Sequence, residues 1–183
     1  MADSPAVDMY RVNMYRLTVA GPPGTPRETT PVNGRHAAGT DGDVTLFLIG
    51  LRLNRWRSIG AGLRVVRAML RLLAGLQGDH ESGYRGHRIL FGPSPREVMV
   101  LQYWAGEDRL RAFATDPGHR HREAWRMFEQ MARSGDGVGL WHEIYRVPPG
   151  GASSFYRDTP PVGLAAVAGL TPKPRGRRVE AHT

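Results

Sequence analysis

Four strand-like segments, separated in a fixed order by helix-like ones, constrain this chain more than any other feature. Residues 44–53 (VTLFLIGLRL) form a continuous apolar run with the length of a strand that is buried on both faces. Three further segments rich in β-branched and aromatic residues follow at 84–91, 97–104 and 138–147. The turn sequence GPSP predicts that the segments at 84–91 and 97–104 pair as a hairpin. We therefore expect one four-stranded antiparallel sheet.

Two stretches between these strands carry apolar residues at helical spacing. Leucine and valine recur every three or four positions through residues 60–76, with Ser58 as an acceptable N-cap. Asp116-Pro117 then starts a second helix over 118–133, which a short helical piece at 108–114 precedes. The order strand, helix, strand, strand, helix, strand is typical of the α+β ferredoxin-like βαββαβ fold, in which both helices cover one face of the sheet.

Both ends of the chain lack this hydrophobic pattern. Residues 21–43 are rich in Gly, Pro and Thr with almost no aliphatic side chains, while 9–19 could form a short strand or a disordered arm. The last residues, 171–183, are proline-rich and basic. We expect a flexible N-terminal segment at 1–43, a folded domain at 44–170 and a flexible C-terminal tail at 171–183.

One face of such a sheet would remain uncovered by helices. An exposed apolar face of this size marks an association surface, so we expect a second copy of the chain to cover it. The predicted assembly is a homodimer that forms a dimeric α+β barrel.

Composition and motifs exclude several classes of function. The chain has no cysteine, which rules out disulfides and thiolate chemistry, and we expect no metal site. It has no apolar stretch of about 18 residues and no signal-peptide pattern, which indicates a cytoplasmic protein without a membrane partner. The net charge of +8 comes almost entirely from dispersed arginine without interleaved aromatics, so no nucleic-acid partner is expected. No phosphate-binding loop, dinucleotide fingerprint or nucleophile elbow occurs.

The strand at 138–147 carries two ionisable groups between apolar neighbours. Alternation places His142 on one face and Glu143 on the other, where Trp141 and Tyr145 flank it. Burying such a group without a partner costs roughly 2 to 7 kcal/mol, so one of the two needs a polar partner or a cavity. We expect His142 to be the catalytic residue, in a pocket that Trp104 also lines, with Glu143 as the alternative.

Three further groups complete the predicted site. His121 falls on the apolar side of the second helix, where a neutral imidazole could act as a base, although a core histidine packed on Trp125 explains it equally well. Gln102 is polar where a core strand favours an aliphatic residue. Arg52 and Asn54 end an otherwise apolar strand, either at the mouth of a chamber or in water. The predicted substrate-binding residues are Arg52, Asn54, Gln102, Trp104, Trp141 and Tyr145.

Four ordered motifs resemble one known family. They are the Tyr103-Trp104 pair, the histidine-containing helix ending in Trp125, the strand motif WHE-x-Y at 141–145, and Y-x-x-x-PP-x-GL at 156–164. Together they resemble the family named after the antibiotic-biosynthesis-type monooxygenase of the fumagillin pathway, over roughly 44–170. The resemblance implies the dimeric α+β barrel fold and an enzyme of secondary metabolism, and it transfers no catalytic residue.

The leading hypothesis is a monooxygenase-like tailoring enzyme that acts on a hydrophobic small molecule without a cofactor. Such an enzyme needs a base, a polar stabiliser and a dry pocket. The first alternative is a haem-dependent enzyme of the dehydratase or peroxidase-like kind, with histidine as the axial ligand. The second is a non-catalytic protein that binds an apolar ligand.

Overall fold

The main sheet consists of the four strands that the sequence predicts. The structure is a computed structural model that describes residues 30–40, 42–92, 94–116, 126, 129–130, 135 and 137–173. Its four-stranded sheet has the order β3-β4-β2-β5, and all neighbouring strands are antiparallel. The strands are β2 (Val44–Leu53), β3 (Tyr84–Phe91), β4 (Glu97–Trp104) and β5 (Val138–Val147). The α+β ferredoxin-like fold is therefore confirmed.

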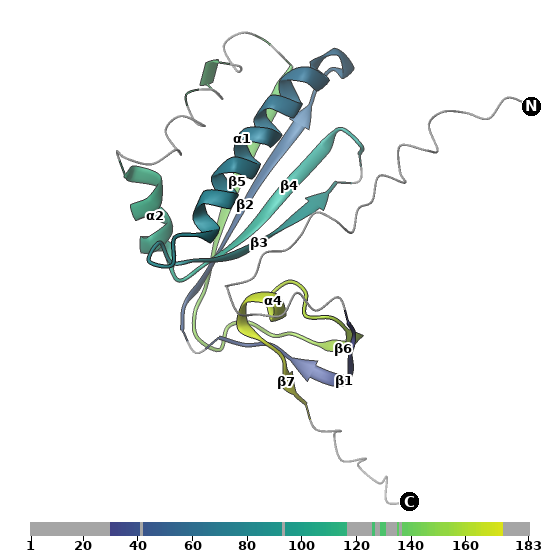
Figure 1. The fold of residues 1–183 in the computed structure, drawn as a ribbon, viewed down its shortest axis with the longest axis vertical. Coiled ribbons are helices and arrows are strands. Elements are labelled where there is room, and N and C mark those ends of the chain that lie inside the picture. The colour runs from purple at the N-terminus through teal and green to yellow at the C-terminus, as the bar shows by residue number, and fades with distance from the viewer. Residues whose placement is uncertain are drawn as a thin grey trace, which may run out of the picture.

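Two described helices accompany this sheet. A 3-10 turn, η2 (Trp56–Ser58), leads into α1 (Ile59–Gln77), which runs across one face of the sheet (Figure 1). The shorter α2 (Glu107–Thr115) follows β4 directly. Most of the helix expected at 118–133 lies outside the described residues, and His121 lies there too.

The core lies between these helices and the sheet, in two clusters. One joins the ends of β2 and β5 to the first turns of α1 and consists of Leu51, Leu53, Ala61, Val65 and Val138. The other joins the last turns of α1 to α2 and to the end of β4, and consists of Leu72, Leu76, Trp104, Leu110 and Phe113. Because β2, β4 and β5 pair residue for residue, the helix-facing side of the sheet carries every second residue of these three strands.

The opposite side of the sheet carries several half-buried apolar side chains. It carries Leu46, Leu48, Met99 and Leu101, and the indole of Trp141 lies over Gly50. A Cβ at Gly50 would lie 2.2 Å from Trp141 Cε2, so only glycine leaves room for this ring. The indole thus packs on the sheet backbone itself.

A second sheet forms where the sequence indicated flexible ends. It has the order β6-β1-β7, with β1 (Val32–Ala37), β6 (Tyr156–Thr159) and β7 (Thr171–Pro172), and the short helix α4 (Ala165–Ala168) lies beside it (Figure 1). Residues 32–37 were expected to be flexible within 1–43, and β7 begins the expected tail. Both segments form strands because each is hydrogen-bonded to residues far away in the sequence.

Those partners are far away in the sequence. Gly34 N–H donates to Asp158 Oδ1 (2.7 Å), and Ser154 Oγ bonds both Ala38 N–H and Ala38 C=O (2.7 Å each). Lys173 N–H donates to the Arg35 carbonyl (2.8 Å). Backbone pairing of this kind requires no hydrophobic pattern in the sequence of the strand, so the sequence of residues 32–37 predicted a linker.

None of the helices among the described residues combines the length and the apolar character needed to cross a bilayer. The same residues contain no group of three or more His, Asp or Glu side chains placed to hold a metal ion.

Candidate functional site

A buried polar cluster occupies one end of the helix-facing side of the sheet. Its members are Tyr84 and His87 on β3 and Gln102 and Trp104 on β4, with Tyr84 opposite Trp104 and His87 opposite Gln102. Trp104 is fully buried, while Gln102 is 3% and His87 4% exposed. Four side chains that carry polar atoms within a core require hydrogen-bond partners inside the protein.

The four side chains form two hydrogen-bonded pairs. Tyr84 Oη lies 2.5 Å from His87 Nδ1, and Trp104 Nε1 donates to Gln102 Oε1 over 3.1 Å. The Tyr84 and Trp104 rings meet edge to face, 5.3 Å apart. The polar cluster is thus packed as one unit against the second core cluster.

A β-bulge brings Tyr84 and His87 together. Residues three apart on a regular strand point to opposite faces. The pairing of β3 with β4 shifts between Tyr84 and Gly86, and Gly86 takes a φ of 150°. The extra residue returns His87 to the face of Tyr84.

Burial keeps both groups of this pair neutral. It lowers the pKa of His87 below its usual 6.5 and raises the pKa of Tyr84 well above its usual value. In the tautomer whose Nδ1–H bonds to Tyr84 Oη, His87 Nε2 is free to accept a proton. A neutral imidazole at pH 7 is what a general base requires.

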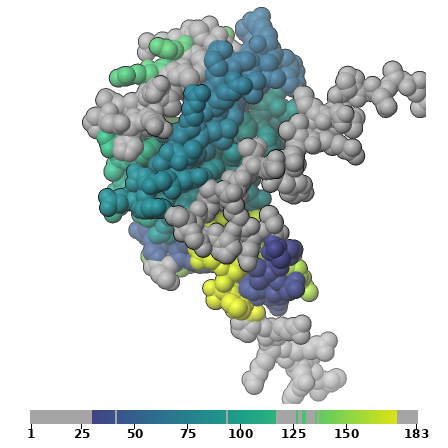
Figure 2. Space-filling view, viewed as in Figure 1, coloured from purple at the N-terminus to yellow at the C-terminus, as the bar shows by residue number. Residues whose placement is uncertain are grey.

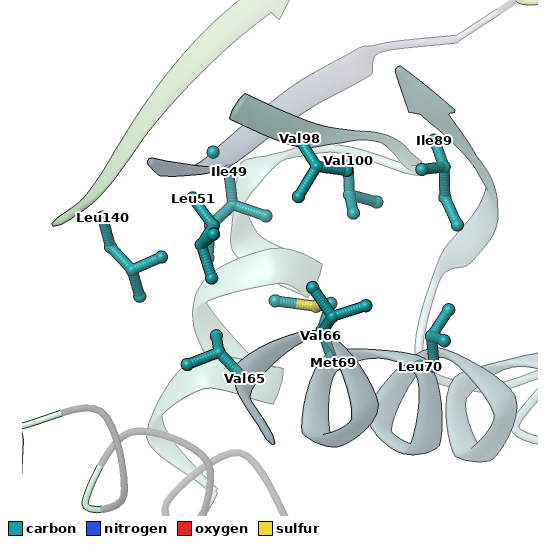
Figure 3. A pocket seen from close by; sticks show the side chains of 11 residues that line it. Ile49, Leu51, Val65, Val66, Met69, Leu70, Ile89, Val98, Val100 and Leu140 are labelled. Carbon is teal, nitrogen blue, oxygen red and sulfur yellow. The ribbon is translucent and has the colours of Figure 1, made fainter. Parts of the chain in front are cut away.

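An apolar cavity lies beside this cluster, between α1 and the sheet (Figure 3). It measures about 50 Å³ and is lined by Ile49, Gly50, Leu51, Val65, Val66, Met69, Leu70, Ile89, Val98, Val100 and Leu140. Ile89 and Val100 are the next residues after His87 and Gln102 on the same face of their strands. Since two residues along a strand span about 7 Å, His87 stands one row from the cavity wall, and Tyr84, opposite Trp104, stands two rows from it.

The structure divides the residues that the sequence analysis proposed for one site. Gln102 and Trp104 lie on the helix-facing side, in the polar cluster. His142 is on that side too, with its ring tilted against Phe47 at 5.8 Å, but it is exposed. Neither Trp104 nor His142 lines the cavity. The pocket of Trp104 and His142 therefore stays a prediction.

The other predicted residues lie elsewhere. Trp141, Glu143, Tyr145 and Arg52 share the opposite side of the sheet, where Tyr145 Oη donates to Glu143 Oε2 (2.7 Å) and Arg52 pairs with Glu97 (3.4 Å). Asn54 follows β2, and its N–H donates to the Gly137 carbonyl (2.8 Å).

A tyrosine pair joins the two sheets on this opposite side. The hydroxyl groups of Tyr103 and Tyr156 both lie beside Gly163, within 3.5 and 3.9 Å of where its Cβ would stand, and Gly163 has a φ of 61°. Tyr156 Oη also accepts the Ala165 N–H (3.2 Å), and burial raises the pKa of Tyr103. The motif at 156–164 therefore anchors the second sheet to β4.

Sequence reasoning missed Tyr84 and His87. Simple alternation separates the two residues, and His87 stands among Arg85, Gly86 and Arg88, as on a solvent-exposed strand. One signal was available, because an isolated glycine inside a strand pattern suggests a bulge.

Comparison with solved structures finds several similar proteins. An aldoxime dehydratase solved with butyraldoxime is 18% identical, with a TM-score of 0.56, over 85% of this chain and 43% of that chain. An inferred antibiotic biosynthesis monooxygenase from Deinococcus radiodurans is 14% identical, with a TM-score of 0.41, over 55% of this chain and 89% of that one. A conserved protein of unknown function from Bacteroides thetaiotaomicron is 12% identical, with a TM-score of 0.42, over 58% of this chain and 99% of that one.

Sequence comparison gives the family. No curated protein sequence matches the chain significantly. The family model described as monooxygenase af470-like matches residues 44–164, which include the whole main sheet and the motif that anchors the second sheet. This match confirms the resemblance drawn from the four motifs. The chain belongs to the monooxygenase af470-like family.

Proposed function

We propose that this protein is a cofactor-independent monooxygenase that oxidises a hydrophobic small molecule between α1 and the sheet, with His87 as the general base. One observation carries the proposal: a buried, neutral histidine, fixed by a tyrosine hydroxyl, stands one row from an apolar cavity. Membership of a monooxygenase family supports the reaction class.

The chemistry explains why a base suffices. A monooxygenase without a cofactor takes its electrons from the substrate, and deprotonation of an acidic C–H group makes the substrate electron-rich enough to react with dioxygen. An activated methylene group and one dioxygen molecule give a carbonyl group and one water molecule, so the reaction balances without an outside reductant. His87 Nε2 would accept the proton, and Tyr84 Oη would hold the ring and stabilise its protonated form.

Gln102 would serve as the polar stabiliser. Its Oε1 accepts the Trp104 indole N–H, so its amide nitrogen is left to donate toward the oxygen of the deprotonated substrate. The wall formed by Ile89, Val100 and Met69 carries no charge, which strengthens both interactions by excluding water.

Oxygen uptake tests the proposal. An anthrone, whose methylene lies between two aromatic rings and opposite the ketone of the central ring, is a suitable probe because its product differs only by a carbonyl in place of that methylene. Wild-type protein should consume one dioxygen per anthrone, and His87→Gln should lower kcat by at least about 100-fold while circular dichroism stays unchanged. His80→Gln, at an exposed histidine in the turn after α1, is the matched control.

Other outcomes would direct the assignment elsewhere. Equal rates for wild type and His87→Gln would refute the role of His87, and a loss with His142→Gln instead would favour the site that the strand pattern suggested. A Soret band on purified protein would indicate a haem-dependent enzyme. Anthrone binding without oxygen uptake would indicate a ligand-binding protein.

We also propose that the chain forms a homodimer through the sheet face opposite α1. Leu46, Leu48, Met99 and Leu101 form a half-buried apolar surface there, next to Trp141. Light scattering should give a dimer at micromolar concentration, and Leu48→Arg should give a monomer. A wild-type monomer would refute the proposal.

A further inference from the structure

The outer flank of α1 carries a row of exposed apolar side chains. Trp56 is 54% exposed, Ile59 51%, Leu63 50% and Leu70 37%. At 100° per residue, Ile59, Leu63 and Leu70 fall within an arc of about 40° on the helix, and Trp56 continues the row at its start. The row is about 21 Å long at 1.5 Å per residue.

A row of arginines borders it. Arg57, Arg64, Arg67 and Arg71 are all exposed, and the helix has no acidic residue. Arg64, Arg67 and Arg71 lie about 80° to 140° around the helix from Ile59, on the side away from the core. Figure 2 shows α1, in blue to teal, at the surface of the molecule along its length. We call the apolar row and these arginines together the α1 patch.

This composition differs from that of an ordinary solvated helix. The inner face of α1 already packs on the sheet through Ala61, Val65, Leu72 and Leu76, so the α1 patch is additional apolar surface. Arg96, from the turn between β3 and β4, lies over the Trp56 ring at 5.3 Å and adds another cation to the same end.

We propose that the α1 patch binds the surface of an anionic phospholipid bilayer. A helix that lies in a membrane surface combines a Trp- or Leu-rich side with flanking arginines, whose heads reach phosphates while the apolar side enters the acyl boundary. Charge complementarity favours a negative partner, because arginines border the row and the sequence of α1 contains no carboxylate.

The α1 patch adjoins the cavity. Leu70 is both exposed in the row and part of the cavity wall. If the proposed function is right, a docked enzyme could take a lipid-dissolved substrate directly into the space between α1 and the sheet. The absence of a long apolar stretch, on which the expectation of no membrane partner rested, excludes a spanning helix but not this mode of binding.

Vesicle binding tests the proposal on the full chain, without substrate. The protein should sediment with vesicles of phosphatidylcholine mixed with phosphatidylglycerol, not with phosphatidylcholine alone, and added salt should weaken binding. Replacing Arg67 and Arg71 with Gln together should weaken binding roughly 30-fold, from the affinity that two surface arginines contribute. Replacing Ile59 and Leu63 with Ser should weaken it similarly.

A matched control separates the α1 patch from the net positive charge. Phe155 and Arg157, beside and on β6, are also exposed, so Phe155→Ser with Arg157→Gln makes one apolar and one charge change of the same kinds elsewhere. This control should bind like wild type. Brominated lipids should quench fluorescence in the wild type, and Trp56→Phe should remove that quenching.

Several results would overturn the proposal. The wild type would fail to bind anionic vesicles at low salt, or the patch variants and the control variant would bind them equally well. Quenching by brominated lipids that does not depend on Trp56 would also count against the proposal. An acidic amphipathic peptide that binds the α1 patch when vesicles do not would also overturn it. Because His87→Gln should bind vesicles normally, loss of oxygenase activity and loss of docking are distinguishable.

Discussion

The neutral state of His87 makes a prediction about stability at acid pH. Burial lowers the pKa of this imidazole in the folded state, whereas the unfolded chain titrates near 6.5. As pH falls through the unfolded value, the unfolded state binds a proton that the folded state does not. Stability is therefore fully present above about pH 6.5 and declines as the solution is acidified.

The size of this effect can be calculated. If His87 stays neutral in the fold, acidification from about pH 7.5 to about pH 5.5 removes about 1.4 kcal/mol from the free energy of unfolding. This is an upper bound, because partial protonation of the folded state reduces it. At a urea m-value of about 2 kcal/mol/M, the midpoint should fall by about 0.7 M.

The assay is urea unfolding of wild type and His87→Gln at both pH values. Glutamine does not titrate, so the variant should lose less stability on acidification than the wild type, and the difference isolates His87 from all other groups. His80→Gln, at an exposed position, should behave like wild type. Identical pH dependence in wild type and His87→Gln would mean that His87 takes up a proton as readily in the folded protein as in the unfolded chain. That result would contradict the neutral state on which the proposed role of His87 as a general base depends.

Two further substitutions test the packing of the opposite face. Gly50→Ala should displace the Trp141 indole and lower the free energy of unfolding by about 1 to 3 kcal/mol. Thermal unfolding and tryptophan emission should both show the change. An unchanged melting temperature would show that the indole does not lie on Gly50. Tyr156→Phe should free the Ala165 N–H and cost about 1 kcal/mol, with faster hydrogen exchange confined to α4 and the second sheet. Tyr145→Phe, at an exposed site, should change neither stability nor exchange, and equal exchange in the two variants would refute the anchoring role.

The candidate site shows where sequence reasoning reaches its limit. Gln102 was singled out because a polar residue interrupts a core strand, and the structure places it in the buried cluster. His87 escaped because one bulge residue reverses the face of every side chain after it. His142 drew attention through its apolar neighbours Leu140 and Ile144, yet it lies on β5, which pairs only with β2 in this sheet of described strands, and is exposed.

The sequence alone determined the order of the elements and therefore the main sheet. Apolar periodicity is a local property, and the ferredoxin-like order follows from it with short, unknotted connections. The second sheet was decided only by tertiary structure, since β1 depends on Asp158, Ser154 and Lys173, more than 110 residues away. The assembly of Tyr84 with His87 was likewise a matter of register. Register and backbone pairing act through contacts between distant residues, and such contacts leave little trace in any one segment of the chain.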